Sequence, residues 1–510
     1  MYETSINENQ NRRASNRATN GTASQRSGAM VEEIRLGRRQ MELLAPAGKR
    51  EILEAVIEAG ADAVYVSGKR FQMRAHRGDF HFDSAGLRDA TRYVHEKGKR
   101  IYVTLNTILA DHELDDVRSF LEELEETGVD AIIVCDLAVL SLARELGVSF
   151  EIHISTMMNV HDLDQVRLLK ELGVQRIVTS RDISITEAGA LGEKSGIPIE
   201  YFVHGDMCVA QSGQCTMSGI TMGKSANRGE CMKPCRWNYE LISLRNGSVS
   251  KPLREGHLMA VRDLSLIRQL PELVAAGICS LKIEGRMRDA AYLSGVVGLY
   301  REVLDEFYRW PGSFYVRSKS METLFRSRVR NLSALSTSGA SSNKTFFDVS
   351  GKREPLILSN GCTEPCADPS AAKAIFFGAI SGDEDRATPE LSVSVGSLAG
   401  AEAALEGGAD RVYLASETSQ FSPEQWTPDT FAEALSLVVE KGAMAGIGTP
   451  RVSTKRVLLE WQCLLRQCQG NPVHYVLVHH LGALKRVREE LPQAKILVDY
   501  GFNTLTTRAA

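Results

Sequence analysis

The chain has 510 residues, of which 43% are hydrophobic and 24% are charged, and its formal net charge is -4. These values are average for a globular enzyme and indicate neither a membrane-embedded protein nor a general polyanion binder. No run approaches the roughly 18 apolar residues that span a bilayer, and no apolar leader opens the chain. We therefore expect a cytoplasmic protein with no membrane partner.

Residues 1–40 are rich in Asn, Ser, Thr and Arg and carry few apolar side chains. Such a segment buries too little apolar surface to offset the entropy of ordering, so we predict a disordered N-terminal tail. An organelle transit peptide is one alternative. A misassigned start ahead of Met30 is the other.

From Glu42 onward, short apolar runs alternate with amphipathic stretches of helical period, as in repeated βα units. Eight runs are predicted to be strands, beginning near residues 42, 63, 100, 131, 150, 176, 199 and 280. Doubly wound sheets alternate in the same way, but the count of eight favours a closed barrel. The sequence therefore predicts an α/β fold whose residues 41–312 form a (β/α)8 TIM-like barrel.

Polar side chains at or after these strands are the candidate site residues, because barrel active sites form at the carboxyl ends of the strands. A single such residue is more often a helix cap or a buried hydrogen-bonding group, so convergence on one rim is the argument. The catalytic candidates are His153, His204, Glu284 and Arg286. The substrate-binding candidates are Arg74, Asn106, Ser155, Thr156, Arg181 and Lys282. Lys282, Glu284 and Arg286 alternate along the last strand and point the same way, which also fits an internal ion-pair network.

Four cysteines follow the seventh predicted strand within the loop 205–237, with the spacing C-x6-C-x15-C-x3-C. They are Cys208, Cys215, Cys231 and Cys235. In a reduced cytosolic chain, clustered thiols indicate a bound metal rather than disulfides. A 4Fe-4S cluster takes four thiolates at varied spacings, whereas structural zinc sites usually contain C-x2-C pairs. Zinc stays open as the alternative metal, and four unliganded thiols are the remaining interpretation.

The segments "EYFVHGDMCVAQSGQCTMS", "RGECMKPCRW" and "LKIEGRMRDAAYLSGVVGLYR" closely resemble the peptidase U32 family. With "LLAPAG", "GADAVYVSGKRFQMR" and "HISTMMN", the resemblance extends over about residues 41–310. The chain departs from the family signature at Asp206, where a small Ser or Ala is expected.

This resemblance implies two activities. One is hydroxylation of a pyrimidine base in tRNA or rRNA by an iron-sulfur enzyme whose 4Fe-4S cluster is held by the four matching cysteines. A prephenate-like carboxylic acid is then the expected hydroxyl donor, Arg286 its carboxylate clamp, and an electron donor an expected partner. The other is collagenase-like proteolysis, for which a metal-activated water between His153, His204 and Glu284 is the most plausible device. A zinc-stabilised noncatalytic RNA or protein binder is the third hypothesis.

An RNA substrate also requires a basic rim around the site. Seven arginines near the predicted strand ends are candidates for it, although scattered arginines solvate any protein surface. They are Arg74, Arg77, Arg181, Arg228, Arg236, Arg286 and Arg288.

The C-terminal part contains a polar region and then an internal repeat. Residues 313–388 are predicted to be a linker or small domain, in which Cys362 and Cys366 are interpreted as surface thiols. Within residues 389–510, "ELSVSVGSLAGAEAALEGGADRVYLAS" parallels "ELLAPAGKREILEAVIEAGADAVYVSG" near residue 42.

Among the identical positions of the two segments, Gly60, Asp62 and Tyr65 in the first correspond to Gly408, Asp410 and Tyr413 in the second. About five strands are predicted there, too few to close a barrel. Truncation, a partner chain that completes the barrel, and an open half barrel are the three alternatives. We expect a docking or scaffold role for this partial repeat.

Overall fold

The computed structural model describes residues 33–34, 39–75, 77–245, 248–249, 253–335, 346–349, 389–415, 426–451, 455–466, 473–502 and 504–509. Most of the predicted tail, and the predicted linker beyond residue 349 with Cys362 and Cys366, lie outside the described residues. The chain divides into two compact units: residues 1–160, 170–367 and 504–510 form the first, and residues 161–169 and 368–503 form the second. No described helix combines the length and the apolar character needed to cross a membrane.

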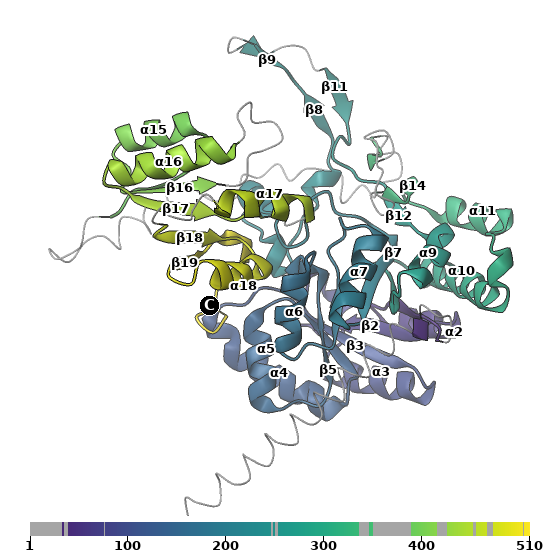
Figure 1. Cartoon of the computed structure of the whole chain (residues 1–510). Helices are drawn as coiled ribbons and strands as arrows, with labels where there is room; N and C mark the ends of the chain where they lie inside the picture. Colours follow the sequence, from purple (N-terminus) through teal and green to yellow (C-terminus); the bar gives the residue numbers. More distant parts are fainter. Residues whose placement is uncertain are drawn as a thin grey trace, which may run out of the picture. The chain divides into compact units, whose positions relative to one another are not determined.

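The first unit contains a closed barrel of eight parallel strands (Figure 1). β13 pairs with β1 on one side and with β7 on the other, which closes the sheet. Each strand falls on one of the eight predicted runs, so the predicted TIM-like barrel is confirmed. The strands are β1 (Glu42–Pro46), β2 (Ala63–Ser67), β3 (Arg100–Leu105), β4 (Ala131–Val134), β5 (Glu151–Ile154), β6 (Arg176–Val178), β7 (Ile199–Gly205) and β13 (Ser280–Ile283).

Helices connect these strands, and local sequence sets their ends. α4 ends at Gly128 and α5 at Gly147, which adopt the left-handed conformation at φ 73° and 67°, as glycines after a helix commonly do. Asp136 caps α5 by accepting a hydrogen bond from Ala138 N, so this strand-end carboxylate is structural. The helices are α2 (Arg50–Glu58), α3 (Ser84–Glu96), α4 (Leu114–Thr127), α5 (Leu137–Leu146), α6 (Leu163–Glu171), α7 (Ile185–Ser195), α9 (Leu270–Ala275) and α10 (Ala290–Arg309).

Several short elements of the first unit were not predicted. β12 (Asp263–Ser265) lies antiparallel to β7, and β14 (Leu332–Ser333) pairs with β12. β8 (Tyr239–Leu241) pairs with β11 (Arg254–Gly256), and β9 (Leu244–Arg245) with β10 (Ser248–Val249). The remaining helices are α8 (Met217–Met222) and α11 (Ser318–Ser327). Strands of two or three residues are too short to carry a periodic signal.

A buried charge network fills the barrel near the amino ends of its strands. Arg176 Nη1 lies 2.5 Å from Glu42 Oε1 and 3.3 Å from Glu200 Oε2. Lys282 Nζ lies 2.6 Å from Glu200 Oε1, and Tyr102 donates its hydroxyl to Glu42 at 2.6 Å. Each buried charge therefore has an opposite partner, which is what makes its burial tolerable.

The second unit contains a five-stranded parallel sheet in sequential order, which confirms the predicted partial repeat (Figure 1). Gly408 adopts a φ of 84° where Gly60 in the first repeat adopts 101°. Its strands are β15 (Ser392–Val395), β16 (Arg411–Ala415), β17 (Met444–Gly448), β18 (Tyr475–Val478) and β19 (Lys495–Val498). Its helices are α15 (Leu398–Glu406), α16 (Pro428–Glu440), α17 (Lys455–Arg466) and α18 (Leu481–Glu490).

Candidate active site at the barrel mouth

A cavity of about 100 Å³ lies at the carboxyl ends of the barrel strands. Two of the four catalytic candidates, Glu284 and Arg286, line it together with all six substrate-binding candidates. The rest of the lining is Tyr65, Met73, Thr104, Ile133, Met157, Val178 and Phe202. The structure thus brings together eight of the ten non-cysteine residues that the sequence singled out.

Arg286 is one of two deeply buried cations that line this cavity, the other being Lys282. Arg286 is 7% exposed, and its Nη1 donates a hydrogen bond to Thr104 Oγ1 at 2.9 Å. Burial, followed by the nearby charge of Arg74, lowers the pKa of Arg286 to about 10. The side chain stays protonated at neutral pH. Arg74 Nη2 is 3.7 Å from Glu284 Oε1, so the one acidic side chain of the lining lies beside another cation.

Arg181 is held in place from two sides. Its guanidinium stacks over the Phe202 ring at 4.1 Å, and its Nη1 donates to the backbone oxygen of Asp206 at 2.9 Å. Its buried Nε finds no hydrogen-bond acceptor among the described residues. The lining thus has four cationic side chains, of which Arg74 lies beside Glu284 and Lys282 pairs with Glu200, so that Arg181 and Arg286 have no carboxylate partner in the lining. The cavity therefore favours an anion.

Asn106 and Ser155 form the polar part of the lining. Asn106 Nδ2 lies 3.5 Å from Ser155 Oγ, and the buried Asn106 Oδ1 has no donor among the residues described. Ser155 also accepts from Met157 N and so caps a short turn. Thr156 donates to the backbone oxygen of Thr179 at 3.0 Å. Asn106 Oδ1 can therefore accept a hydrogen bond from a ligand, and Arg181 Nε can donate one to a ligand.

His153 and His204 do not line the cavity. His153 is fully buried, with its Nε2 2.9 Å from Glu151 Oε2 and its ring packed edge-on against Tyr102. His204 lies 3.3 Å from the Tyr292 hydroxyl, and burial, together with the charge of Arg288, lowers its pKa to about 4. The two histidines and Glu284 do not form a group of ligand atoms within 4.8 Å in the described part of the chain.

The loop that carries the four cysteines packs against the residues of the cavity wall. Thr156 Oγ1 lies 3.3 Å from Ser212 Oγ in this loop, and Ala75 N donates to Gly229 O at 3.0 Å. Gly229 has a φ of 85°, and a Cβ there would lie 2.3 Å from the backbone oxygen of Gln72. Only glycine fits this close approach without a shift of the backbone.

The four cysteines of this loop are free thiols, and Cys208 interacts electrostatically with each of the other three. Burial raises the pKa of Cys208, and the neighbouring Cys215 and Cys231 raise it further. Burial likewise raises the pKa of Cys235 to about 12, with Cys208 and Cys231 among the additional causes. A group of thiols that resist ionisation in isolation would ionise on binding a cation, as thiolate ligands do.

Asp206 holds the two ends of the cysteine loop together, a role that the sequence did not predict. Its carboxylate pairs with Lys233 and Arg236, each at 2.6 Å, and with Arg330 at 2.5 Å. Burial alone would raise the pKa of Asp206, but these three cations hold it well below its usual value. Lys233 and Arg236 flank Cys235, so the departure at Asp206 fixes the backbone next to the fourth thiol.

The predicted basic rim is only partly available for a polyanion. Arg236 is buried against Asp206, and Arg228 pairs with Glu113 through two contacts of 2.7 Å. Arg77 pairs with Asp79 at 3.2 Å. Arg74, Arg181 and Arg286 are the rim arginines that line the cavity.

Comparison with known proteins places this site in a wider context. The model of peptidase family U32 matches residues 48–344. A tRNA hydroxylation protein P1 of Bacillus subtilis is 33% identical over 58% of this chain and 70% of its own length. A 23S rRNA 5-hydroxycytidine synthase of Escherichia coli is 38% identical over 52% of this chain and 39% of its own length. An uncharacterized protease of Methanocaldococcus jannaschii is 34% identical over 54% of this chain and 67% of its own length.

Proposed function

This chain belongs to peptidase family U32, and from that premise we propose that it is an iron-sulfur enzyme that hydroxylates a pyrimidine base in tRNA or rRNA. The observation that carries the proposal is the joining of a cation-lined cavity to the four-cysteine loop through Arg181, Thr156 and Gly229. Two of the relatives at 33% and 38% identity are named for hydroxylation of RNA.

Cys208, Cys215, Cys231 and Cys235 would hold a 4Fe-4S cluster. The C-x6-C-x15-C-x3-C spacing lacks the C-x2-C pairs that are usual in structural zinc sites, whereas a 4Fe-4S cluster takes four thiolates at varied spacings, which supports the cluster. When bound, such a cluster would supply one-electron chemistry beside the cavity, and an electron donor would be needed only to bring the cluster to its active oxidation state, because exchange of a hydroxyl between donor and base consumes no net electrons.

Arg286 and Arg181 are proposed to bind the carboxylate of the hydroxyl donor, a prephenate-like acid. A guanidinium provides paired donors for a carboxylate, and a buried one binds it more strongly than a surface one. The exchange balances without dioxygen: the base loses a hydrogen and gains a hydroxyl, and the donor loses that hydroxyl and gains a hydrogen. The donor is thus reduced by the two electrons that the base gives up.

Asn106 and Ser155 are proposed to read the edge of the extruded base. The unmet Asn106 Oδ1 accepts a hydrogen bond from a ring or exocyclic N–H, while Tyr65 and Phe202 give the cavity flat apolar walls. Glu284, beside Arg74, is positioned to accept the proton that leaves the base. His153 and His204 lie outside the lining, and their predicted catalytic roles stay predictions.

Mass spectrometry of tRNA and rRNA from a deletion strain tests this function. A hydroxylated pyrimidine should disappear on deletion, return with the wild-type gene, and stay absent with Cys231→Ala. Cys463→Ala is the matched control, because Cys463 is a free thiol on α17 of the second unit. An unchanged set of modified nucleosides in the deletion strain would contradict the proposal.

A metal-assisted peptidase is the second candidate, and the relative named as a protease favours it. The device proposed for it, a metal bound by His153, His204 and Glu284, would require these side chains to move together, since their ligand atoms do not group in the described structure. Cleavage of denatured collagen that survives Cys231→Ala and fails in Glu284→Gln would support this candidate.

A further inference from the structure

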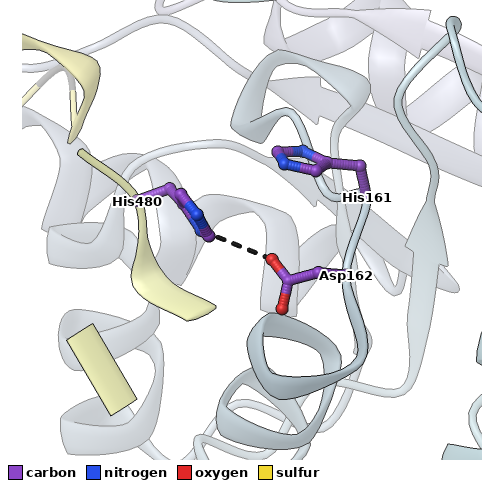
Figure 2. A group of neighbouring side chains, drawn as sticks. All are labelled: His161, Asp162 and His480. Carbon is purple, nitrogen blue, oxygen red and sulfur yellow. Dashed lines mark ion pairs between the residues drawn. The ribbon is translucent and has the colours of Figure 1, made fainter. Parts of the chain in front are cut away.

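The second unit contains a compact group of metal-binding side chains far from the cysteine loop in sequence. His161 and Asp162 directly precede α6, and His480 directly precedes α18 (Figure 2). One ligand atom from each of the three lies within 4.8 Å of the other two. Figure 2 shows the three side chains turned toward one another.

The carboxylate of Asp162 is the least satisfied member of this group. Its Oδ1 accepts a hydrogen bond from Gln165 N at 2.9 Å, at the start of α6. Its side chain is 5% exposed. The buried Oδ2 receives no hydrogen bond from any described residue. A buried carboxylate oxygen with no donor needs a cation or a proton nearby.

The neighbour of this oxygen does not supply the missing proton. His480 Nδ1 lies 3.3 Å from Asp162 Oδ2, and the same nitrogen accepts a hydrogen bond from Ala483 N as the cap of α18. A ring nitrogen that accepts a hydrogen bond presents a lone pair rather than a proton. When Asp162 is ionised, two lone pairs therefore face each other across 3.3 Å.

The surrounding backbone is shaped to hold the carboxylate there. A Cβ on Gly482 would lie 2.2 Å from Asp162 Oδ1 and 2.5 Å from Oδ2, so the first turn of α18 approaches the carboxylate as only glycine permits. Arg486, on the same helix, pairs with Asp164 in the first turn of α6. Both helices are thus fixed around the three side chains.

We propose that His161, Asp162 and His480 bind a divalent transition-metal ion. This site is separate from the barrel cavity and from the four-cysteine loop. Two imidazoles and one carboxylate are the ligands of zinc and of other borderline first-row ions, whereas calcium and magnesium take mainly oxygen ligands. The ion would occupy the space between the facing lone pairs of Asp162 and His480. Its role is to fasten residues 161–162 to the amino end of α18 within the second unit.

Cobalt(II) is the probe of choice, because it substitutes for zinc and its visible spectrum distinguishes ligands. The full-length chain, treated with a chelator and kept anaerobic, is titrated with cobalt(II). Ions bound by thiolates give intense sulfur charge-transfer bands, and an ion bound by His and Asp gives only the weaker ligand-field bands. We expect one cobalt(II) per chain of the second kind.

Three conservative variants locate that ion. His480→Asn keeps a side chain that caps helices well, Asp162→Asn keeps the acceptor for Gln165 N, and His161→Gln keeps the polarity. Each should weaken cobalt(II) binding by at least about tenfold, as even indirect changes around metal ligands do. His474→Asn is the matched control, since His474 Nδ1 accepts a hydrogen bond from Ala445 N and an Asn oxygen can replace it.

The sulfur charge-transfer bands of the four cysteines, recorded before and after cobalt(II) is added, serve as an internal reference in every variant, whichever metal these cysteines hold. Loss of the ligand-field bands in the three variants, with unchanged sulfur bands, would support the site. An unchanged circular dichroism spectrum would show that each variant is folded. Equal ligand-field intensity in wild type, Asp162→Asn and His480→Asn would overturn the proposal. Absence of any non-thiolate cobalt(II) in the wild type would overturn it as well.

Discussion

The barrel and the partial repeat of the second unit begin alike and differ at the carboxyl ends of their strands. Leu43 N donates to Asp62 Oδ2 at 2.9 Å, and Leu391 N donates to Asp410 Oδ2 at 2.7 Å. The same side chain therefore fastens the first strand to the turn before the second strand in both repeats. The shared part of the repeat is a device for building parallel strands.

The difference lies in what the strand ends carry. The barrel mouth gathers four cations and one carboxylate around a cavity, and a four-cysteine loop follows β7. In the second unit, Thr449 accepts a hydrogen bond from His479 N, and His479 Nε2 lies 3.0 Å from Asp499 Oδ2. These polar groups partner one another. The comparison teaches that the repeat supplies the scaffold and that the chemistry depends on residues added at the mouth.

The strand interiors differ in a related way. Tyr65 pairs in register with Tyr102 in the barrel, and both rings are buried inside it. The equivalent register in the second sheet joins Tyr413 to Gly446, where a Cβ would lie 2.4 Å from the Tyr413 ring. At this register the barrel therefore has two tyrosine rings, whereas the sheet of the second unit has one, from Tyr413, packed over Gly446.

The strongest test of this contrast is Asp206→Asn. The substitution leaves Lys233, Arg236 and Arg330 without their shared anion, and we expect it to cost about 3–5 kcal/mol in the free energy of unfolding of the first unit. Denaturant titration measures the cost. Asp410→Asn is the control in the second unit, because its amide oxygen still accepts from Leu391 N. Equal effects of the two variants would break the comparison.

Acid should act on the first unit through Glu42. Burial alone would raise the pKa of Glu42, but Arg176, Tyr102 and Ser280 lower it from 4.5 to about 2. Because the folded-state pKa is depressed, this carboxylate stabilises the barrel above pH 4.5, and the contribution is lost as the pH falls toward 2. The loss is on the order of 3 kcal/mol.

The equivalent carboxylate of the second repeat provides the control for this pH dependence. Glu390 is 53% exposed and pairs with Arg411 on the surface, so it should contribute little. Unfolding free energies measured between pH 5 and 2.5, about the range of these carboxyl groups, should change slope in Glu42→Gln and not in Glu390→Gln. The same slope in wild type and Glu42→Gln would contradict the assignment.

Arg286→Gln should reduce RNA hydroxylation by about a hundredfold, comparable with removal of one buried donor from a charge-stabilising site. The amide cannot provide the charge that holds the carboxylate of the hydroxyl donor. Quantitative mass spectrometry of the modified nucleoside measures the effect. Arg411→Gln removes a cation of the second unit that pairs with Glu390 and should leave hydroxylation unchanged. Similar losses in both variants would indicate a general effect on folding.

The smallest expected effect concerns the shared aspartates. Asp62→Ala and Asp410→Ala each remove the acceptor of a strand N–H, which should cost about 1–3 kcal/mol in unfolding free energy. Asp62→Ala should cost more, because Asp62 also contacts Arg301 at 3.1 Å and Lys99 at 3.3 Å. Thermal unfolding of the two variants checks the order, and a larger loss in Asp410→Ala would reverse it.

Much of the fold could be predicted because apolar runs and glycine stops are local signals. The eight barrel strands and the five strands of the repeat lie where periodicity placed them, whereas β12 and β14 are too short to show a pattern. Strand position also predicted which side chains would line the mouth. It did not give their depth, so His153 and His204, at similar places along β5 and β7, lie outside the cavity.

Partners distant in sequence were the part that could not be predicted. Asp206 was noticed only as a departure from a family signature, because its role depends on Arg330 as well as on the cysteine loop. The group of His161, Asp162 and His480 carries no spacing signal, since two of its members and the third lie on opposite sides of the long polar region. Such clusters become visible only when the chain is folded.

The measurement that tests the central claim most directly is the iron and sulfide content of the anaerobically purified chain. Wild type, Cys231→Ala and Cys463→Ala are compared by elemental analysis and absorption spectroscopy. The account predicts about four irons and four sulfides per chain in wild type and Cys463→Ala, with both lost in Cys231→Ala. Absence of iron from the wild type, or the same iron content in Cys231→Ala, would contradict it.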